Sequence, residues 1–229
     1  MRCTLIGTGN VATNLLPALE EAGHQVKQLH GRSFGICDVT GEVVIVCVKD
    51  SALSYVMQRL SNCPQLVVHT AGSMGVETVP AKHRGVLYPL QTLSKQRIIS
   101  LKEVPMFVES DTDIELLEQL AHSLSHRVYR ATSLQRRQLH LAAVFACNFT
   151  NHCYTLAHGL LKQSGLPFEV LLPLIDETAN KVHQLPPQLS QTGPAVRWDE
   201  NVITRHLDML DGYTREIYEL MSKSIHDKL

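Results

Sequence analysis

The stretch that most constrains the fold of this chain is its first dozen residues. A short apolar run ends in Gly7 and passes through a Gly-x-Gly-x-x-Ala sequence into an amphipathic stretch. This order of strand, tight turn and helix start is typical of dinucleotide-binding folds. Gly7 allows the sharp turn, Gly9 lets backbone N–H groups approach a diphosphate, and Ala12 lets the helix pack close to the strand. We therefore predict nucleotide binding rather than a merely structural turn, with contacts from Gly7, Thr8, Gly9, Asn10, Val11 and Ala12.

The end of the second predicted strand bears on which cofactor is bound. That strand, residues 25–30, runs into Gly31-Arg32-Ser33, and no Asp or Glu occurs between Gly23 and Cys37. Proteins of this kind that prefer NAD carry an acidic residue about 20 residues beyond the glycines, whereas an arginine suits the 2′-phosphate of NADP. The sequence therefore favours NADP over NAD, with Arg32 and Ser33 as contacts. The alternative is a solvated loop arginine.

Polar residues follow two predicted buried strands. Residues 43–48 form a continuous apolar run, the pattern of a strand covered on both faces, and residues 66–69 predict the next buried strand. Ligands collect beyond the carboxyl ends of parallel strands, so residues after these runs should face the Gly-rich turn. We predict that Val48 and Lys49 contact the cofactor. We also predict that His69 and Ser73 contact the substrate, although His69 could instead bond a neighbouring carbonyl.

Strands and helices alternate as far as about residue 131. Further strands are predicted at 85–88, 106–109 and 128–130, with a helix at 111–124. The segment 34–41 is too short for a helix and a strand, so the sheet should be abbreviated there. This alternation predicts an α/β fold, in which a Rossmann-like, mostly parallel sheet forms a dinucleotide-binding domain over residues 1–131.

The remaining residues, 132–229, carry no strand pattern and predict an all-α domain. Residues 133–163 contain no proline and can form one long helix, on the order of 45 Å in length. A second helix is expected at 168–183, an irregular segment at 185–199, and a final helix from about Val202. Such a domain of about 100 residues cannot bury all its apolar faces alone. We therefore predict a homodimer, through a stripe formed by Ile203, Leu207, Leu210, Ile217 and Met221.

Composition excludes several classes of function. Charged residues make up 19% of the chain and the net charge is -1, which gives no reason to expect nucleic acid or a membrane surface as a partner. No apolar run approaches the roughly 20 residues that span a bilayer. The chain enters its first strand directly, so we expect no signal peptide, and the six cysteines form no C-x-x-C pair. These features predict a reduced cytoplasmic protein without a structural metal.

Several strings resemble one known family when taken together. They are Gly7 to Ala12, His69-Thr70-Ala71-Gly72-Ser73, Tyr88-Pro89-Leu90-Gln91-Thr92, Ala146-Cys147-Asn148-Phe149 and Gln191-Thr192-Gly193-Pro194. They resemble a bacterial family of Rossmann-like proteins with a helical C-terminal domain of unassigned function, whose members are named NADP oxidoreductases from their fold. More remotely, the layout is similar to pyrroline carboxylate reductase and to phosphogluconate dehydrogenase-like proteins. The resemblance implies NADP as the cofactor and a small-molecule substrate.

The long predicted helix carries the candidate catalytic residues. The resemblance to phosphogluconate dehydrogenase-like proteins implies a catalytic lysine and asparagine on this helix, but residues 138–148 contain no lysine. His140 and Asn148, eight residues apart, lie near one face at 3.6 residues per turn. His140 could act as a general acid and base, because the free pKa of histidine is near neutrality. Equally, both residues could be buried polar groups that bond the two domains together.

These observations predict an oxidoreductase that transfers hydride between NADP and a small polar metabolite at an interdomain cleft. Arg197, within the irregular segment, offers a planar fork suited to an anionic substrate group. The alternative to this anion-binding role is a structural one, in which Arg197 pairs with Asp199. The rival function is a non-catalytic nucleotide-binding sensor or partner-binding protein, which the missing lysine favours.

Overall fold

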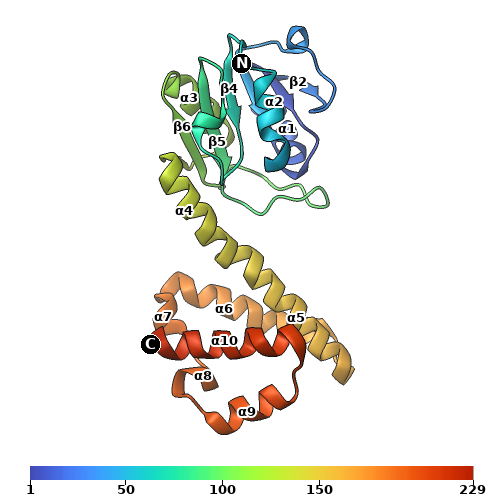
Figure 1. Cartoon of the computed structure of the whole chain (residues 1–229), viewed down its shortest axis with the longest axis vertical. Helices are drawn as coiled ribbons and strands as arrows, with labels where there is room; N and C mark the ends of the chain where they lie inside the picture. The colour runs from blue at the N-terminus through green and yellow to red at the C-terminus, as the bar shows by residue number, and fades with distance from the viewer. Residues whose placement is uncertain (229) are drawn as a thin grey trace. The chain divides into compact units, whose positions relative to one another are not determined.

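The structure is a computed structural model that describes residues 1–228. It divides into two compact units, Met1–Phe149 and Thr150–Leu229. The first unit is built on one mostly parallel seven-stranded sheet, and the second is helical (Figure 1). The predicted fold class, an α/β Rossmann-like sheet followed by an all-α region, is therefore confirmed.

The sheet has the strand order β2-β1-β3-β4-β5-β6-β7. Neighbouring strands pair in parallel except β5 and β6, which pair antiparallel. The strands are β1 (Arg2–Ile6), β2 (Gln25–Leu29), β3 (Val43–Val46), β4 (Leu66–His69), β5 (Arg84–Pro89), β6 (Met106–Ser110) and β7 (Val128–Arg130). Only a 3-10 turn, η1 (Ile36–Asp38), lies between β2 and β3 within the described chain, which confirms the abbreviated segment expected there.

Both faces of the sheet are covered by apolar side chains. One core cluster joins Leu5 and Ile45 to residues of α1 (Asn10–Glu21) and α3 (Ile114–Leu124). The other joins neighbouring strand residues, such as Val44, to α2 (Asp50–Gln58). Successive strand side chains point to opposite faces, so continuous β-branched runs are what a sheet buried on both sides requires.

A continuous helical stretch follows β7. It comprises α4 (Ser133–Ala143), a π-helical turn η3 (Val144–Phe149) and α5 (Thr150–Ser164). Thr132 begins it with a capping box, because its hydroxyl accepts from the Gln135 N–H while the Gln135 side chain accepts from the Thr132 N–H. The predicted long helix is therefore confirmed, apart from its π-helical turn. The compact units divide at the end of that turn, so α4 belongs to the unit that contains the sheet.

The second unit is more finely divided than the sequence predicted. Its elements after α5 are η4 (Phe168–Leu171), α6 (Leu172–Gln184), α7 (Pro187–Ser190), α8 (Pro194–Arg197), α9 (Glu200–Asp208) and α10 (Gly212–Lys228). The segment 185–199 is thus not simply irregular. Gly193 adopts a φ of 109° and is followed by Pro194, whose fixed φ suits the first position of a helix.

The predicted final helix and its apolar stripe also need correction. The helix is broken between α9 and α10, where Gly212 adopts a φ of 47°. The stripe is therefore spread over two helices and their junction. Ile203 is buried, whereas Met221 is exposed. One residue of the stripe is thus buried and another is exposed, and a homodimer through this stripe stays a prediction.

Candidate functional site

The Gly-rich turn connects β1 to α1 and passes close to β3. Gly7 has a φ of 130°, and a Cβ at this position would lie 2.3 Å from the Cys47 carbonyl oxygen, so only glycine fits here. Gly9 precedes α1 and makes no side-chain cap, which leaves the first N–H groups of the helix available to a ligand. Ala12 is fully buried against the sheet.

A cavity of about 300 Å³, the cationic cavity, borders this turn. Three positively charged side chains line it, those of Arg32, Lys49 and Lys95, and its lining contains no Asp or Glu. Gly7, Thr8, Gly9 and Val48 also line it, as predicted for a cofactor site, whereas Ser33 lies outside the lining. Lys95 is not predictable from the sequence, because this residue follows the turn by more than 80 positions and belongs to no motif.

A second cavity of about 620 Å³, the His140 cavity, borders the other end of the same turn. Asn10 and Val11 line it together with residues that follow β5 and residues of α4 and η3. The structure therefore brings the predicted pair, His140 and Asn148, into one lining. The cavity is lined by Asn10, Val11, Tyr88, Leu90, Gln91, Thr92, Leu93, Leu139, His140, Ala142, Ala143, Val144, Ala146, Cys147 and Asn148.

Tyr88 and His140 are hydrogen-bonded within this lining. The Tyr88 hydroxyl lies 3.1 Å from His140 Nδ1, and the two rings meet edge to face. A Cβ at Gly72 would lie 2.8 Å from both the Tyr88 ring and His140 Nδ1, so the backbone after β4 presses against the pair. Burial raises the pKa of the Tyr88 hydroxyl, which adds to the preference for the protonated form that tyrosine already has at neutral pH.

His69, predicted as a substrate contact, does not line either cavity. Its side chain is 0% exposed, and both ring nitrogens have partners within the loop after β4. Nδ1 accepts from the Ala71 N–H at 3.2 Å, and Nε2 lies 3.1 Å from the Gly75 carbonyl, to which it must donate. Burial lowers the pKa of His69 to about 4. In this structure the neutral ring holds the loop, as the alternative weighed from the sequence expects.

The other two predicted substrate residues occupy different parts of the chain. The Ser73 hydroxyl donates to Asp50, at the start of α2. Arg197 lies on α8 in the second unit, where its side chain is exposed. No hydrogen bond or ion pair joins it to Asp199 among residues 1–228; the Asp199 side chain instead caps α9 by accepting from the Val202 N–H. An anion-binding role for Arg197 stays a prediction.

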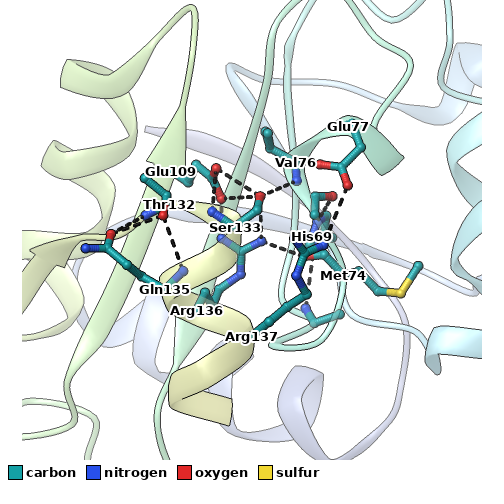
Figure 2. Close-up of polar contacts among 12 residues, drawn as sticks. His69, Met74, Val76, Glu77, Glu109, Thr132, Ser133, Gln135, Arg136 and Arg137 are labelled. Atoms are coloured by element: carbon teal, nitrogen blue, oxygen red, sulfur yellow. Dashed lines mark hydrogen bonds and ion pairs between the residues drawn. The ribbon is translucent and has the colours of Figure 1, made fainter. Parts of the chain in front are cut away.

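A buried ion pair that the sequence pattern does not predict anchors α4 to the sheet. Arg136 is 0% exposed and donates to the carboxylate of Glu109, a residue of β6 (Figure 2). Glu109 also accepts from the Ser133 N–H at 2.8 Å, and Arg136 donates to the Met74 carbonyl. Because Arg136 precedes His140 by one helical turn, these bonds fix the part of α4 that carries His140.

Among residues 1–228, no helix is both long and apolar enough to cross a membrane. The same residues contain no group of three or more His, Cys, Asp or Glu side chains placed to hold a metal ion.

The fold and the two cavities define a Rossmann-like protein with a helical second unit. Residues 104–225 match the family described as a domain of unknown function, DUF2520, and this chain belongs to that family. The family resemblance expected from the sequence is therefore confirmed. Among proteins of curated function, none matches the chain.

Solved structures show the same fold. A protein from Bacteroides fragilis, named "putative NADP oxidoreductase", is 44% identical, covers 99% of this chain and 98% of its own, and has a TM-score of 0.90. A protein from Thermotoga maritima is 20% identical, with coverage of 98% and 97% and a TM-score of 0.71. An imine reductase from Myxococcus stipitatus, in complex with NADP+, is 12% identical, with coverage of 99% and 92% and a TM-score of 0.69.

Proposed function

We propose that this protein is an NADP-dependent oxidoreductase whose cofactor lies across the Gly-rich turn. The observation that carries the proposal is that one turn borders two cavities of opposite character. Residues 7–9 line a cavity with three cations, and Asn10 and Val11 line a cavity without Asp, Glu, Lys or Arg. A dinucleotide is divided in the same way, because its phosphate groups are anionic whereas its nicotinamide ring carries no negative charge. The names of the Bacteroides and Myxococcus proteins support a nicotinamide cofactor.

The cationic cavity suits the phosphate end of the cofactor. Diphosphate would meet the N-terminus of α1, where the backbone N–H groups and the helix dipole favour negative charge. Arg32 follows β2, the position from which an arginine reaches a 2′-phosphate in this fold. The guanidinium can form paired, charge-assisted hydrogen bonds with a phosphate. We therefore assign NADP rather than NAD as the preferred cofactor.

The His140 cavity suits the reacting end. A nicotinamide held there would supply hydride to the carbon of a C=O or C=N group, and the protein would supply the proton for the oxygen or nitrogen of that group. Donation of the Tyr88 hydroxyl to His140 Nδ1 would place the ring proton on Nε2, the nitrogen left to serve the substrate. Asn148 lines the same cavity and offers both a donor and an acceptor to orient the substrate.

Oxidation of NADPH in the presence of a panel of small ketones, aldehydes and imines tests this proposal. Against the best substrate of the panel, we expect His140→Gln to lower kcat by roughly 10²- to 10⁴-fold, the usual contribution of a positioned acid or base. His140→Gln should leave the Kd for NADPH nearly unchanged. Tyr88→Phe should lower kcat less, because the imidazole remains.

His152→Gln is the matched control, since this exposed histidine follows on the same helical stretch and does not line the cavity. Equal loss of kcat in both histidine variants would contradict the role of His140. Tight NADPH binding without turnover of any compound would favour the second candidate, a nucleotide-binding sensor or partner-binding protein. The specific observation in its favour is the absence of a lysine from residues 138–148.

A further inference from the structure

A long loop between β5 and β6 brings one lysine to the cationic cavity. The loop covers residues 90–105 and contains no helix or strand (Figure 1, green). Lys95 lines the cavity together with residues of the Gly-rich turn, although it is remote from them in sequence. A loop of this length inside a compact unit is uncommon unless it serves a function.

The loop is fastened to α1 by a buried side chain. Asn14 is 0% exposed, and its amide nitrogen donates to the Asn10 carbonyl at 2.9 Å and to the Ser94 carbonyl at 3.0 Å. Its amide oxygen accepts from the Ile99 N–H at 3.2 Å. One side chain therefore holds the loop on both sides of Lys95. Asn14 lies one turn into the helix whose N-terminus faces the cavity.

The charge at this cavity is uncompensated. No ion pair or hydrogen bond joins the side chains of Lys95, Lys49 or Arg32 to another group in the described chain, and the lining contains no carboxylate. Three cations around one cavity repel one another, so an anionic ligand would relieve the repulsion.

We propose that Lys95 binds the diphosphate of the cofactor and that Asn14 is the residue that positions it. This inference rests on the proposed function. Ser94 bonds to Asn14 one turn into α1, which places the backbone of Lys95 near the helix N-terminus, where diphosphate is expected. Arg32 instead lies in the turn after β2 and would serve the 2′-phosphate. Lys95 should therefore contribute equally to the binding of NADPH and NADH.

Calorimetric titrations of Lys95→Gln with NADPH and NADH test the assignment. Loss of one charge-assisted hydrogen bond should raise both Kd values by about 10-fold or more, and by similar factors. Lys102→Gln is the matched control, because Lys102 is an exposed lysine that pairs with Glu21 and does not line the cavity. Unchanged Kd values in Lys95→Gln, or loss confined to NADPH, would overturn the assignment.

A double-variant comparison tests the role of Asn14. Asn14→Ala should weaken NADPH binding in the native background and add little further loss in Lys95→Gln, because both changes remove the same contact. Fully additive losses would overturn the positioning role. If Asn14→Ala does not fold, hydrogen exchange on the native protein replaces it: NADPH should slow exchange at the Ile99 amide, and unchanged exchange there would overturn the proposal.

The two proposals fail in different ways. A native protein that binds neither NADPH nor NADH would end the proposed function and, with it, the assignment of Lys95. A native protein that binds NADPH as tightly as Lys95→Gln does would end only the assignment of Lys95.

Discussion

The two compact units differ in how much of their apolar surface each one covers. The first unit holds both core clusters, which enclose the sheet on its two faces. In the second unit, as far as residue 228, the buried residues are Ala195, Ile203 and Ser222. Large apolar side chains remain exposed there, namely Leu160, Leu166, Val170, Leu172, Leu174, Val182, Leu185, Leu189, Met209, Tyr213, Leu220 and Met221.

We infer from this difference in burial that the two units have different roles. The first unit contains every residue that lines the cationic cavity and the His140 cavity, and its buried core holds those residues in place. The second unit leaves more apolar surface uncovered than a helical unit of its size can easily keep in water. We therefore assign ligand binding to the first unit and propose that the second associates with a further copy of the chain.

The largest expected effect follows removal of Arg136. Arg136→Met leaves the carboxylate of Glu109 without its buried partner, which should lower the free energy of unfolding by about 3–5 kcal/mol. Urea denaturation, with hydrogen exchange followed in β5 and β6, measures the loss. The double variant Arg136→Met with Glu109→Gln should recover part of it. A single variant as stable as the native protein would contradict the view that this pair anchors α4.

The next effect concerns cofactor choice. Arg32→Gln should weaken NADPH binding by about 1.5–3 kcal/mol and leave NADH binding unchanged, because only NADPH carries the 2′-phosphate. Arg127→Gln serves as the control, since Arg127 is exposed and pairs with Glu103 outside the cavity. Calorimetric titration with NADPH and with NADH measures the two Kd values. Equal affinities of native protein and Arg32→Gln for NADPH would count against the assignment.

His69 should make the first unit sensitive to acid. Its pKa is about 4 in the folded protein and near 6.5 when unfolded, so on acidification the unfolded chain takes up the proton first. Its contribution is fully present above pH 6.5 and is lost as the pH falls toward 4. Between pH 7 and pH 5, the native protein should lose about 2 kcal/mol more stability than His69→Gln. Parallel pH profiles of the two proteins would contradict the neutral, buried ring.

The smallest expected effect concerns the oligomeric state of the protein. We expect light scattering at micromolar concentration to give twice the monomer mass of 25.5 kDa. Leu174→Asp, on the exposed apolar surface of α6, should shift the protein toward the monomer. Leu134→Asp, at a similarly exposed leucine of the first unit, should not. A monomeric native protein would remove the distinction drawn between the two units.

The strands and the Gly-rich turn could be predicted because their signals are local. Continuous β-branched runs and closely spaced glycines are governed by steric rules that act within a few residues. The same holds for the pairing of His140 with Asn148, which follows from helical periodicity alone. The break at Gly212 and the short helix after Gly193 are not predictable in this way, because glycine permits a positive φ without requiring it.

The remaining features depend on contacts between distant segments. Lys95 reaches the cationic cavity only because Asn14 holds its loop, and no spacing in the sequence reveals that bond. Arg136 looks like an ordinary surface residue of an amphipathic helix until Glu109 is brought beside it. His69 was correctly placed at a strand end, but its burial depends on the fold of the loop that follows.

A crystal structure of the protein with NADP+ bound is the most direct test of the central claim. We expect the diphosphate to lie against residues 7–9 and the 2′-phosphate to contact Arg32. The nicotinamide ring should enter the cavity lined by Tyr88, His140 and Asn148. A complex in which the ring lies outside that cavity, or in which the 2′-phosphate lies away from Arg32, would contradict it.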